Sequence, residues 1–140
     1  MNDRFKFRIY DLEQKHYLRV IQDETTGAEG FAAFYGKYNN ICKPMSFFLC
    51  HDIDRWVIEQ CTGLKDKNGN LIYEGYIVKC DRDFDPDGRV NLTKEVIFTD
   101  GSFTLANLDP KNRDFCYINR FHNIEIIGNI HEQAEQKDMK

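Results

Sequence analysis

An acidic segment, Asp81–Asp87, holds the residues of this sequence whose types and spacing most resemble a metal site. Its aspartates recur at every second position from 83 to 87 and Gly88 follows, which is the first half of a calcium-binding loop. In such a loop alternate carboxylates point inward and the glycine permits the bend. The second half fails, because Lys94 stands where a bidentate glutamate belongs and Glu95 comes one place late. Pro86 with Gly88 is ordinary turn chemistry, so we interpret the segment as a solvated hairpin turn.

The cysteines give neither metal-knuckle spacing nor a disulfide framework; they lie at positions 42, 50, 61, 80 and 116. A structural zinc site typically uses cysteines paired two residues apart, and a disulfide scaffold uses an even number. We therefore expect reduced thiols and a cytoplasmic location. Cys80 and Cys116 stand in apolar runs, where cysteine behaves as a small buried side chain.

A nucleophilic enzyme brings a Cys or Ser, a His and an acid to one point. Cys50, His51 and Asp52 are consecutive, so no regular element turns all three toward one reaction centre. No spacing pairs His122 or His131 with a nucleophile. We predict no catalytic residue, no cofactor and no metal, and keep a small metal-dependent or hydrolytic enzyme as a third hypothesis.

The composition is that of a globular chain of 140 residues, rich in aromatic side chains and with a formal net charge of −4. Its Lys and Arg residues are scattered, which argues against strong binding to phosphates, although a small local patch stays open. No leader and no membrane-spanning run is visible. Stacking of single-stranded nucleic acid on tyrosines is an alternative, although packing explains them better. These tyrosines are Tyr10, Tyr35, Tyr38, Tyr73 and Tyr76.

The elements that would position any site are strands joined by turns. At the centre of the chain, apolar runs at 56–58 and 77–78 flank a segment dense in turn residues. Asn68-Gly69 predicts a two-residue hairpin turn, because these residues tolerate the positive φ angles that both central positions require. Gly63 and Gly75 predict further turns or a bulge.

The rest of the chain divides around this centre. Residues 4–21 predict an N-terminal hairpin, since 4–10 alternate and a second apolar run follows. Residues 22–55 predict a long irregular excursion carrying some short strand or helix, interrupted by Gly30 and Gly36 and broken again at Lys43-Pro44.

A β core over 56–128 ends at Gly128-Asn129, and a polar tail over 129–140 would form a short helix or a frayed end. Short strands with frequent turn signals predict a mainly β (β-rich α+β) fold. We expect a small barrel or roll of antiparallel hairpins in a single domain over 1–140.

The central stretch also resembles the signature of the YopX-like family, small proteins encoded by bacteriophages and prophages. The resemblance rests on Thr62–Gly69, on Ile72–Gly75 and on Ile77-Val78. It extends to Phe7–Asp11 near the start and to Ile127–Glu132 near the end. These matches keep the family order over most of the chain. They imply a β unit reminiscent of SH3-type barrels and a phage setting, and they name no reaction.

Two positions depart from the family pattern. Tyr76 stands where the family usually has Asp, and His131 where it has an aromatic residue, usually Tyr. The residues that we carry over as family signature, structural or partner-facing, are Thr62, Gly63, Leu64, Lys65, Asp66, Asn68, Gly69, Tyr73, Glu74, Gly75, Gly128 and Asn129.

Together these observations favour a non-enzymatic phage or prophage accessory protein that acts by binding. We expect it to form a homo-oligomer, because exposed sheet edges need covering and self-association covers them. An unknown protein partner stays open, and no membrane role is expected. The alternative from a different class is a nucleic-acid-associated module that uses the face of a β-barrel.

Overall fold

The computed structural model describes residues 6–23, 33–39, 41–83 and 86–132, and these residues are mostly antiparallel β-structure. The mainly β fold class is therefore confirmed, including a sheet that curls into a half-barrel. The contacts group the chain into two compact units, Met1–Cys61 and Thr62–Lys140. Strand β6 (Trp56–Lys65) runs from the first unit into the second. The single domain over 1–140 stays a prediction.

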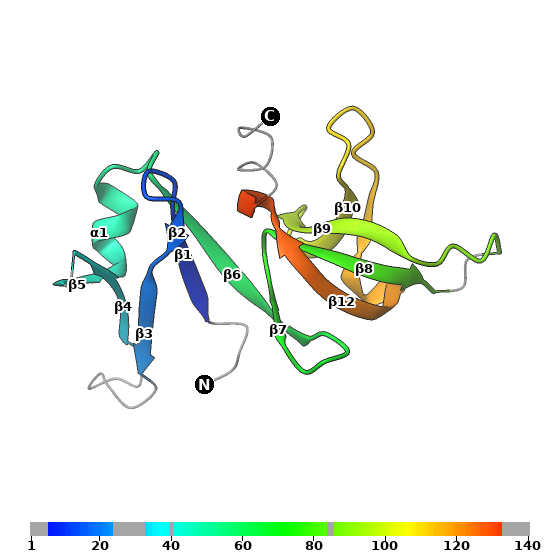
Figure 1. Cartoon of the computed structure of the whole chain (residues 1–140), viewed down its shortest axis with the longest axis horizontal. Helices are drawn as coiled ribbons and strands as arrows, with labels where there is room; N and C mark the ends of the chain where they lie inside the picture. Colours follow the sequence, from blue (N-terminus) through cyan, green and yellow to red (C-terminus); the bar gives the residue numbers. More distant parts are fainter. Residues whose placement is uncertain (1–5, 24–32, 40, 84–85, 133–140) are drawn as a thin grey trace. The chain divides into compact units, whose positions relative to one another are not determined.

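The first unit holds two small sheets and one helix (Figure 1). Its elements are β1 (Phe7–Asp11), β2 (His16–Tyr17), β3 (Arg19–Asp23), β4 (Ala33–Tyr38), β5 (Ile41–Pro44), α1 (Met45–Cys50) and the first part of β6. Strand β1 lies between β2 and β6, and β4 lies between β3 and β5. The core of this unit is a cluster of Ile9, Leu18, Phe48 and Trp56.

The predicted N-terminal hairpin is present in a shorter form. Strand β1 pairs with β2 through Tyr10 opposite Tyr17, and the chain then bends at Leu18. The backbone N–H of Leu18 still bonds the carbonyl of Ile9, 2.9 Å away, but the residues after it form β3 and pair with β4 instead. The second apolar run thus contributes to two sheets: Tyr17 pairs with β1, and the residues from Arg19 on pair with β4. Leu18, between them, is buried in the core of this unit.

The excursion predicted at 22–55 carries short strands and a short helix as expected, and its described part is more regular than predicted. Strands β4 and β5 and helix α1 occupy residues 33–38, 41–44 and 45–50. Gly36 does not interrupt β4. The position needs a glycine, because a Cβ there would lie 2.6 Å from the Phe48 ring. Pro44 does break the chain as expected, since β5 ends at this residue and α1 begins after it. Residues 24–32, with Gly30, lie outside the described residues.

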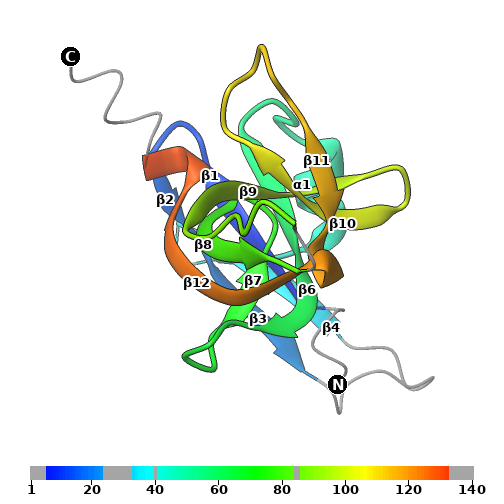
Figure 2. The same cartoon turned by 90° about the vertical axis from the view of Figure 1, so that its right-hand side faces the viewer.

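The second unit is built on a five-stranded antiparallel sheet in the order β11-β10-β9-β8-β12. Its elements are β7 (Leu71–Tyr73), β8 (Tyr76–Arg82), β9 (Leu92–Thr99), β10 (Ser102–Asn107), β11 (Phe115–Tyr117), the 3-10 helix η2 (Ile118–Arg120) and β12 (Phe121–Asn129). Figure 2 shows β12 curving around the sheet. Two register shifts against β8, one beside Asn123 with its φ of 57°, mark the bulges that curl it.

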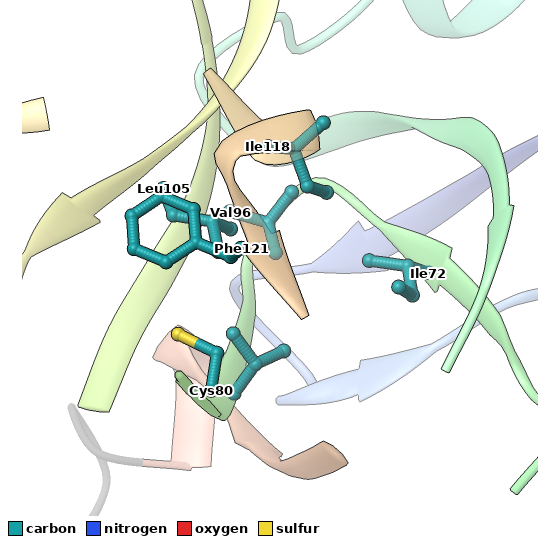
Figure 3. Packing of buried hydrophobic residues seen from close by; sticks show 7 residues of the cluster. Ile72, Cys80, Val96, Leu105, Ile118 and Phe121 are labelled. Carbon is teal, nitrogen blue, oxygen red and sulfur yellow. The ribbon is translucent and has the colours of Figure 1, made fainter. Parts of the chain in front are cut away.

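The curled sheet closes over a cluster of seven buried side chains (Figure 3). They are Ile72, Val78, Cys80, Val96, Leu105, Ile118 and Phe121. Cys80 is buried as predicted, and burial raises the pKa of its thiol to about 11. Cys116 is partly buried and packs against the same cluster. Each strand of the sheet contributes at least one packed side chain, so this cluster fixes the curl.

The tight turn with positive φ at two central residues is present, but at Asp100-Gly101 rather than at Asn68-Gly69. Asp100 and Gly101 have φ angles of 52° and 75°, and Thr99 pairs directly with Ser102. At the central hairpin only Gly69 has a positive φ, of 85°. The backbone there closes by bonds from Asp66 to Asn70 and from Gly69 to Asp66. This is a three-residue loop in which a glycine in the left-handed region forms the bulge.

The end of the core is also as predicted, because β12 ends at Asn129. Residues 130–132 begin a helical turn. The rest of the predicted tail, residues 133–140, lies outside the described residues, as do residues 4–5 of the predicted hairpin.

Candidate functional site

The signature residues gather in the second unit at two places. One is the turn between β6 and β7, reached through Thr62, Gly63, Leu64 and Lys65. Gly63 has a φ of 83°, and the Thr62 hydroxyl accepts a hydrogen bond from the Leu64 amide at 3.1 Å. Leu64, Lys65 and Asn68 are exposed, so a partner can reach these signature side chains.

Asp66 is the centre of this turn, and its side chain is buried although it carries a charge. One carboxylate oxygen accepts hydrogen bonds from the backbone amides of Asn68 and Asn70, each at 2.9 Å. The other oxygen accepts the amide of Ile126, in β12, at 3.2 Å. We refer to Asp66 with these three amides as the Asp66 clamp. It closes its own turn and holds that turn against β12.

The electrostatics of the clamp favour the ionised carboxylate. Burial alone raises the pKa of Asp66, but the backbone hydrogen bonds from Asn70, Ile126 and Asn68 outweigh it and lower the pKa below its ordinary value.

Next to the clamp, the Lys67 amide bonds the carbonyl of Ile124 at 2.8 Å. Strand β12 lies at the edge of the five-stranded sheet, so the turn covers backbone groups that an edge strand otherwise leaves open.

The second place joins the remaining signature residues. Gly75, with a φ of 84°, donates its amide to the carbonyl of Val96 and accepts the amide of Ile130 at its own carbonyl. Asn129 accepts the amides of His131 and Glu132 with its side-chain oxygen, each at 3.0 Å. The bond from Ile130 to Gly75 and the pairing of Gly128 and Asn129 with β8 fasten the turn before β8 to the end of β12. At both places, signature residues therefore make contacts that hold the fold.

The two departures from the family pattern lie in packed surroundings. Tyr76 packs against the core cluster of the second unit, with its ring edge-on to the ring of Tyr73 at 6.1 Å between centroids. His131 is buried. An aromatic ring at position 76 therefore fills space where the family usually carries a carboxylate.

The residues that first suggested metal or nucleophile chemistry do not converge. Among the described residues, no group of three His, Cys, Asp or Glu side chains is placed to hold a metal ion. His51 stacks on Phe47, its carbonyl accepts the indole N–H of Trp56, and Cys50 is exposed at the end of α1. His51 therefore serves the packing beside α1, and Cys50, its exposed neighbour, does not join it in one centre.

The acidic segment forms a loop between β8 and β9. Its ends are closed by a bond of 3.2 Å from the Arg82 amide to the carbonyl of Arg89, and Gly88 has a φ of 62°. The Asp81 carboxylate accepts the Asn91 amide and the Asn123 side chain. The Asn91 bond, followed by the Asn123 bond, lowers the pKa of Asp81. These bonds tie the loop to its own ends, as in a turn; residues 84–85 lie outside the described residues.

The first unit holds a charged cluster that spacing in the sequence did not reveal. Arg55 donates from Nε and Nη2 to the two carboxylate oxygens of Asp11, each at 2.9 Å, and from Nη1 to the hydroxyl of Tyr38. Burial raises the pKa of Asp11, but the bond from Arg55 and the amides of Gln14 and Glu13 outweigh it and lower the pKa. Asp11 and Arg55 lie 44 residues apart in the chain, which is why no local motif marks them.

Beside this cluster the surface is hollowed over about 700 Å³. The lining combines apolar and acidic side chains: Leu12, Glu13, Cys50, Asp52, Ile53, Asp54 and Arg55. Leu12 and Ile53 are 45% and 64% exposed, and Leu49 on α1 is 60% exposed. We name this region the α1 surface; it belongs entirely to the first unit.

A family model described as YopX protein matches residues 6–136. The chain belongs to the YopX family. Among solved structures, protein YopX from Bacillus subtilis is 24% identical with a TM-score of 0.52, over 96% of this chain and 98% of that one. Protein EF1440 from Enterococcus faecalis is 29% identical with a TM-score of 0.53, over 94% and 96%. The comparison with curated proteins gave no match. The resemblance read from Thr62–Gly75 and its flanking motifs is thereby confirmed.

The YopX likeness extends over nearly the whole of each solved chain, so both units of this protein have counterparts there. Neither structure's description names a reaction, a ligand or a partner. No helix in the described part of the chain is long and apolar enough to cross a membrane.

Proposed function

We propose that this YopX protein is a non-enzymatic, phage- or prophage-encoded binding module that works as a homo-oligomer in the cytoplasm of a bacterial host. The free thiols of Cys50, Cys80 and Cys116 support a reducing compartment. Asp66, Gly75 and Asn129 of the signature hold turns and strands together, which points to other surfaces for the contact with a partner. The α1 surface is the contact region that the geometry supports best.

The observation that carries the proposal is the exposure of large apolar side chains around one hollow. Leu12 and Ile53 line the hollow and are 45% and 64% exposed, and Leu49, beside the lining residue Cys50, is 60% exposed. A group of exposed apolar side chains rimmed by charged ones is typical of a protein–protein contact. Here the rim is acidic, through Asp52 and Asp54. A contact of this kind gains from apolar burial, while the rim carboxylates select a partner surface with cations.

The occupant that we propose is a second copy of the chain. Self-association removes the exposed apolar side chains from water at the protein's own concentration and needs no other gene product. It also covers sheet edges, of which β5 is one in the described part of the first unit, with Ile41 56% exposed. An oligomer built on the α1 surface therefore explains both exposures with one contact.

The test is the subunit number of the purified protein, by light scattering behind size exclusion over a dilution series. We expect a discrete oligomer that Ile53→Ser weakens by about tenfold or more in dissociation constant, since an apolar anchor at the centre of a contact carries much of its energy. The matched control is Val90→Ser, because Val90 is 61% exposed but lies on the second unit.

A wild-type chain that is monomeric at every concentration would contradict the proposal. So would an oligomer that Ile53→Ser and Leu49→Ser leave as strong as Val90→Ser does. Retained thermal stability of the two variants shows that any loss of subunits comes from the contact and not from unfolding.

A further inference from the structure

Three arginines that are scattered in the sequence meet at one place in the second unit. Arg82 is the last residue of β8, and Arg120 is the last residue of η2. Arg89 lies opposite Arg82, in the loop between β8 and β9. Backbone bonds bring them together: the Arg82 amide bonds the carbonyl of Arg89, and the Asp83 amide bonds the carbonyl of Arg120 at 2.8 Å. The chain is acidic overall, so such a local gathering of guanidinium groups is an exception to its general charge.

The arginines line a hollow of about 540 Å³. Its other lining residues are Asp83, Pro86, Asp87, Cys116 and Tyr117. A smaller hollow of about 120 Å³ shares Arg82, Arg89 and Cys116 with it. That hollow adds Lys94, Asn107, Asp114, Phe115 and Phe121. The two hollows form one surface, which we name the arginine surface.

Two exposed aromatic rings stand on this surface. Phe115 and Tyr117 are 46% and 54% exposed and lie on β11; Phe115 lines the smaller hollow, Tyr117 the larger, and Cys116 between them lines both. Alternate residues of a strand share a face, and the rise per residue places the two side chains about 7 Å apart. Strand β11 lies at the edge of its sheet, so these rings are open to a ligand along the strand.

Three carboxylates line this surface, those of Asp83, Asp87 and Asp114, and the first two lie close to cationic or hydrogen-bonding neighbours. Asp83 accepts a hydrogen bond from Nδ1 of His122. Asp87 lies 3.6 Å from the guanidinium of Arg89, in a pair whose side chains are 72% and 52% exposed. An exposed pair of this kind is weak, so a phosphate can replace the carboxylate at Arg89. Arg82 lies beside β11, with Nη2 4.0 Å from the sulfur of Cys116.

We propose that the arginine surface binds single-stranded nucleic acid. Phe115 and Tyr117 each stack a base, and Arg82, Arg89 and Arg120 contact the phosphates. Open aromatic rings beside a cationic groove are what single strands need, since every base has a face to stack and every nucleotide a phosphate to neutralise. This inference rests on the second unit alone and does not depend on self-association through the α1 surface.

The site differs from the one that the tyrosines in the sequence suggested. Of those tyrosines, Tyr73 and Tyr76 belong to the second unit, and neither is among the residues that line the arginine surface. Tyr117 and Phe115 carry the stacking instead, because only the fold brings β11 beside the three arginines.

The test is fluorescence anisotropy with labelled oligonucleotides of about 15 residues, one of deoxythymidine and one of uridine, which is within the usual range of site sizes. At about 50 mM salt we expect saturable binding of at least one of them. Three phosphate contacts predict a slope of about −2 in the plot of log affinity against log salt. The two oligonucleotides show whether the surface prefers a DNA or an RNA strand, and preference for either supports the proposal.

Paired variants separate stacking from charge. We expect Tyr117→Ala and Arg120→Gln each to weaken binding by about fivefold or more. The controls are Phe98→Ala, an aromatic ring 51% exposed on β9, and Lys79→Gln, an exposed cation on β8. Both controls remove similar groups from the same unit outside the arginine surface, so binding should stay within about twofold.

Two results would overturn the inference. One is the absence of binding at low salt to either oligonucleotide. The other is equal binding of a polyglutamate peptide of similar charge together with no effect of Tyr117→Ala, which would make the surface a docking place for acidic protein segments. Melting temperatures of all four variants, measured alongside, identify any variant that has lost its fold. Phe115→Ala then takes the place of a Tyr117→Ala protein that fails to fold.

Discussion

Replacing Asp66 by Asn is the change that tests the structural reading of the signature most sharply. The substitution keeps the size and shape of the side chain and removes its charge. In the structure the carboxylate accepts three backbone amides, two at one oxygen and that of Ile126 at the other. An asparagine has one acceptor oxygen, so its NH₂ group must face one of these amides, donor against donor.

The magnitude follows from those three bonds. A hydrogen bond to a charged acceptor contributes about 1.5–3 kcal/mol and a neutral one about 1 kcal/mol, and a buried donor left unpaired costs about 1–3 kcal/mol. Two bonds weakened and one amide left unpaired give an expected loss of about 3 kcal/mol in the free energy of unfolding. Such a loss is a large share of the stability of a small protein.

The assay is equilibrium unfolding in urea, with amide hydrogen exchange as a local readout. We expect the Ile126 amide to lose protection in Asp66→Asn. The control is Asp109→Asn, because Asp109 also accepts a backbone amide, that of Lys111 at 2.9 Å, but in an exposed loop. That control should cost less than about 1 kcal/mol. If Asp66→Asn costs no more than the control and Ile126 keeps its protection, the clamp is not structural and the signature needs another explanation.

Three further predictions concern pH, packing and charge. The folded-state pKa values of Asp66 and Asp11 are lowered from 3.8, so their stabilisation is present above that pH and falls as the pH drops below it. A plot of unfolding free energy against pH should therefore be less steep in this range for Asp66→Asn than for the wild-type chain. Gly36→Ala should lose about 2–3 kcal/mol in urea unfolding, because its Cβ meets the buried Phe48 ring, whereas Gly128→Ala meets only the movable end of Glu132 and should lose under about 1 kcal/mol; equal losses would refute the packing argument. Arg55→Met should lower the melting temperature more than Arg113→Met, since it leaves buried Asp11 without its cation. Adding Asp11→Asn to Arg55→Met should restore part of the lost stability. If nothing is restored, the loss does not come from this ion pair.

Much of the second unit could be predicted from local patterns, because its strands are short, alternate and end in strong turn signals. The turn chemistry was assigned to the wrong pair, however. Asn68-Gly69 and Asp100-Gly101 look equally suited to two positive φ angles, and only the Asp66 carboxylate decides that the first loop takes three residues. Its partner Ile126 lies 60 residues away, beyond the reach of any local pattern.

The first unit was harder to predict for a physical reason. Gly36 has the appearance of a strand breaker in the sequence, yet it lies inside β4 because the Phe48 ring fills the space that a side chain would need. The contact joins two elements that are separate in the chain, so local patterns predict only some short strand or helix there and miss how regular residues 33–50 are. The arginine surface illustrates the same limit, since Arg82, Arg89 and Arg120 are scattered in the sequence and meet only through backbone bonds.

The central claim of this account is that the protein is a non-enzymatic module that acts as an oligomer. Native mass spectrometry of protein purified gently from a bacterial cytoplasm tests it most directly, because one spectrum reports subunit number, metal and bound ligand. The account predicts a discrete, metal-free oligomer for the wild-type chain and a shift toward monomer for Ile53→Ser. A monomer that carries a stoichiometric metal ion or small molecule would contradict it.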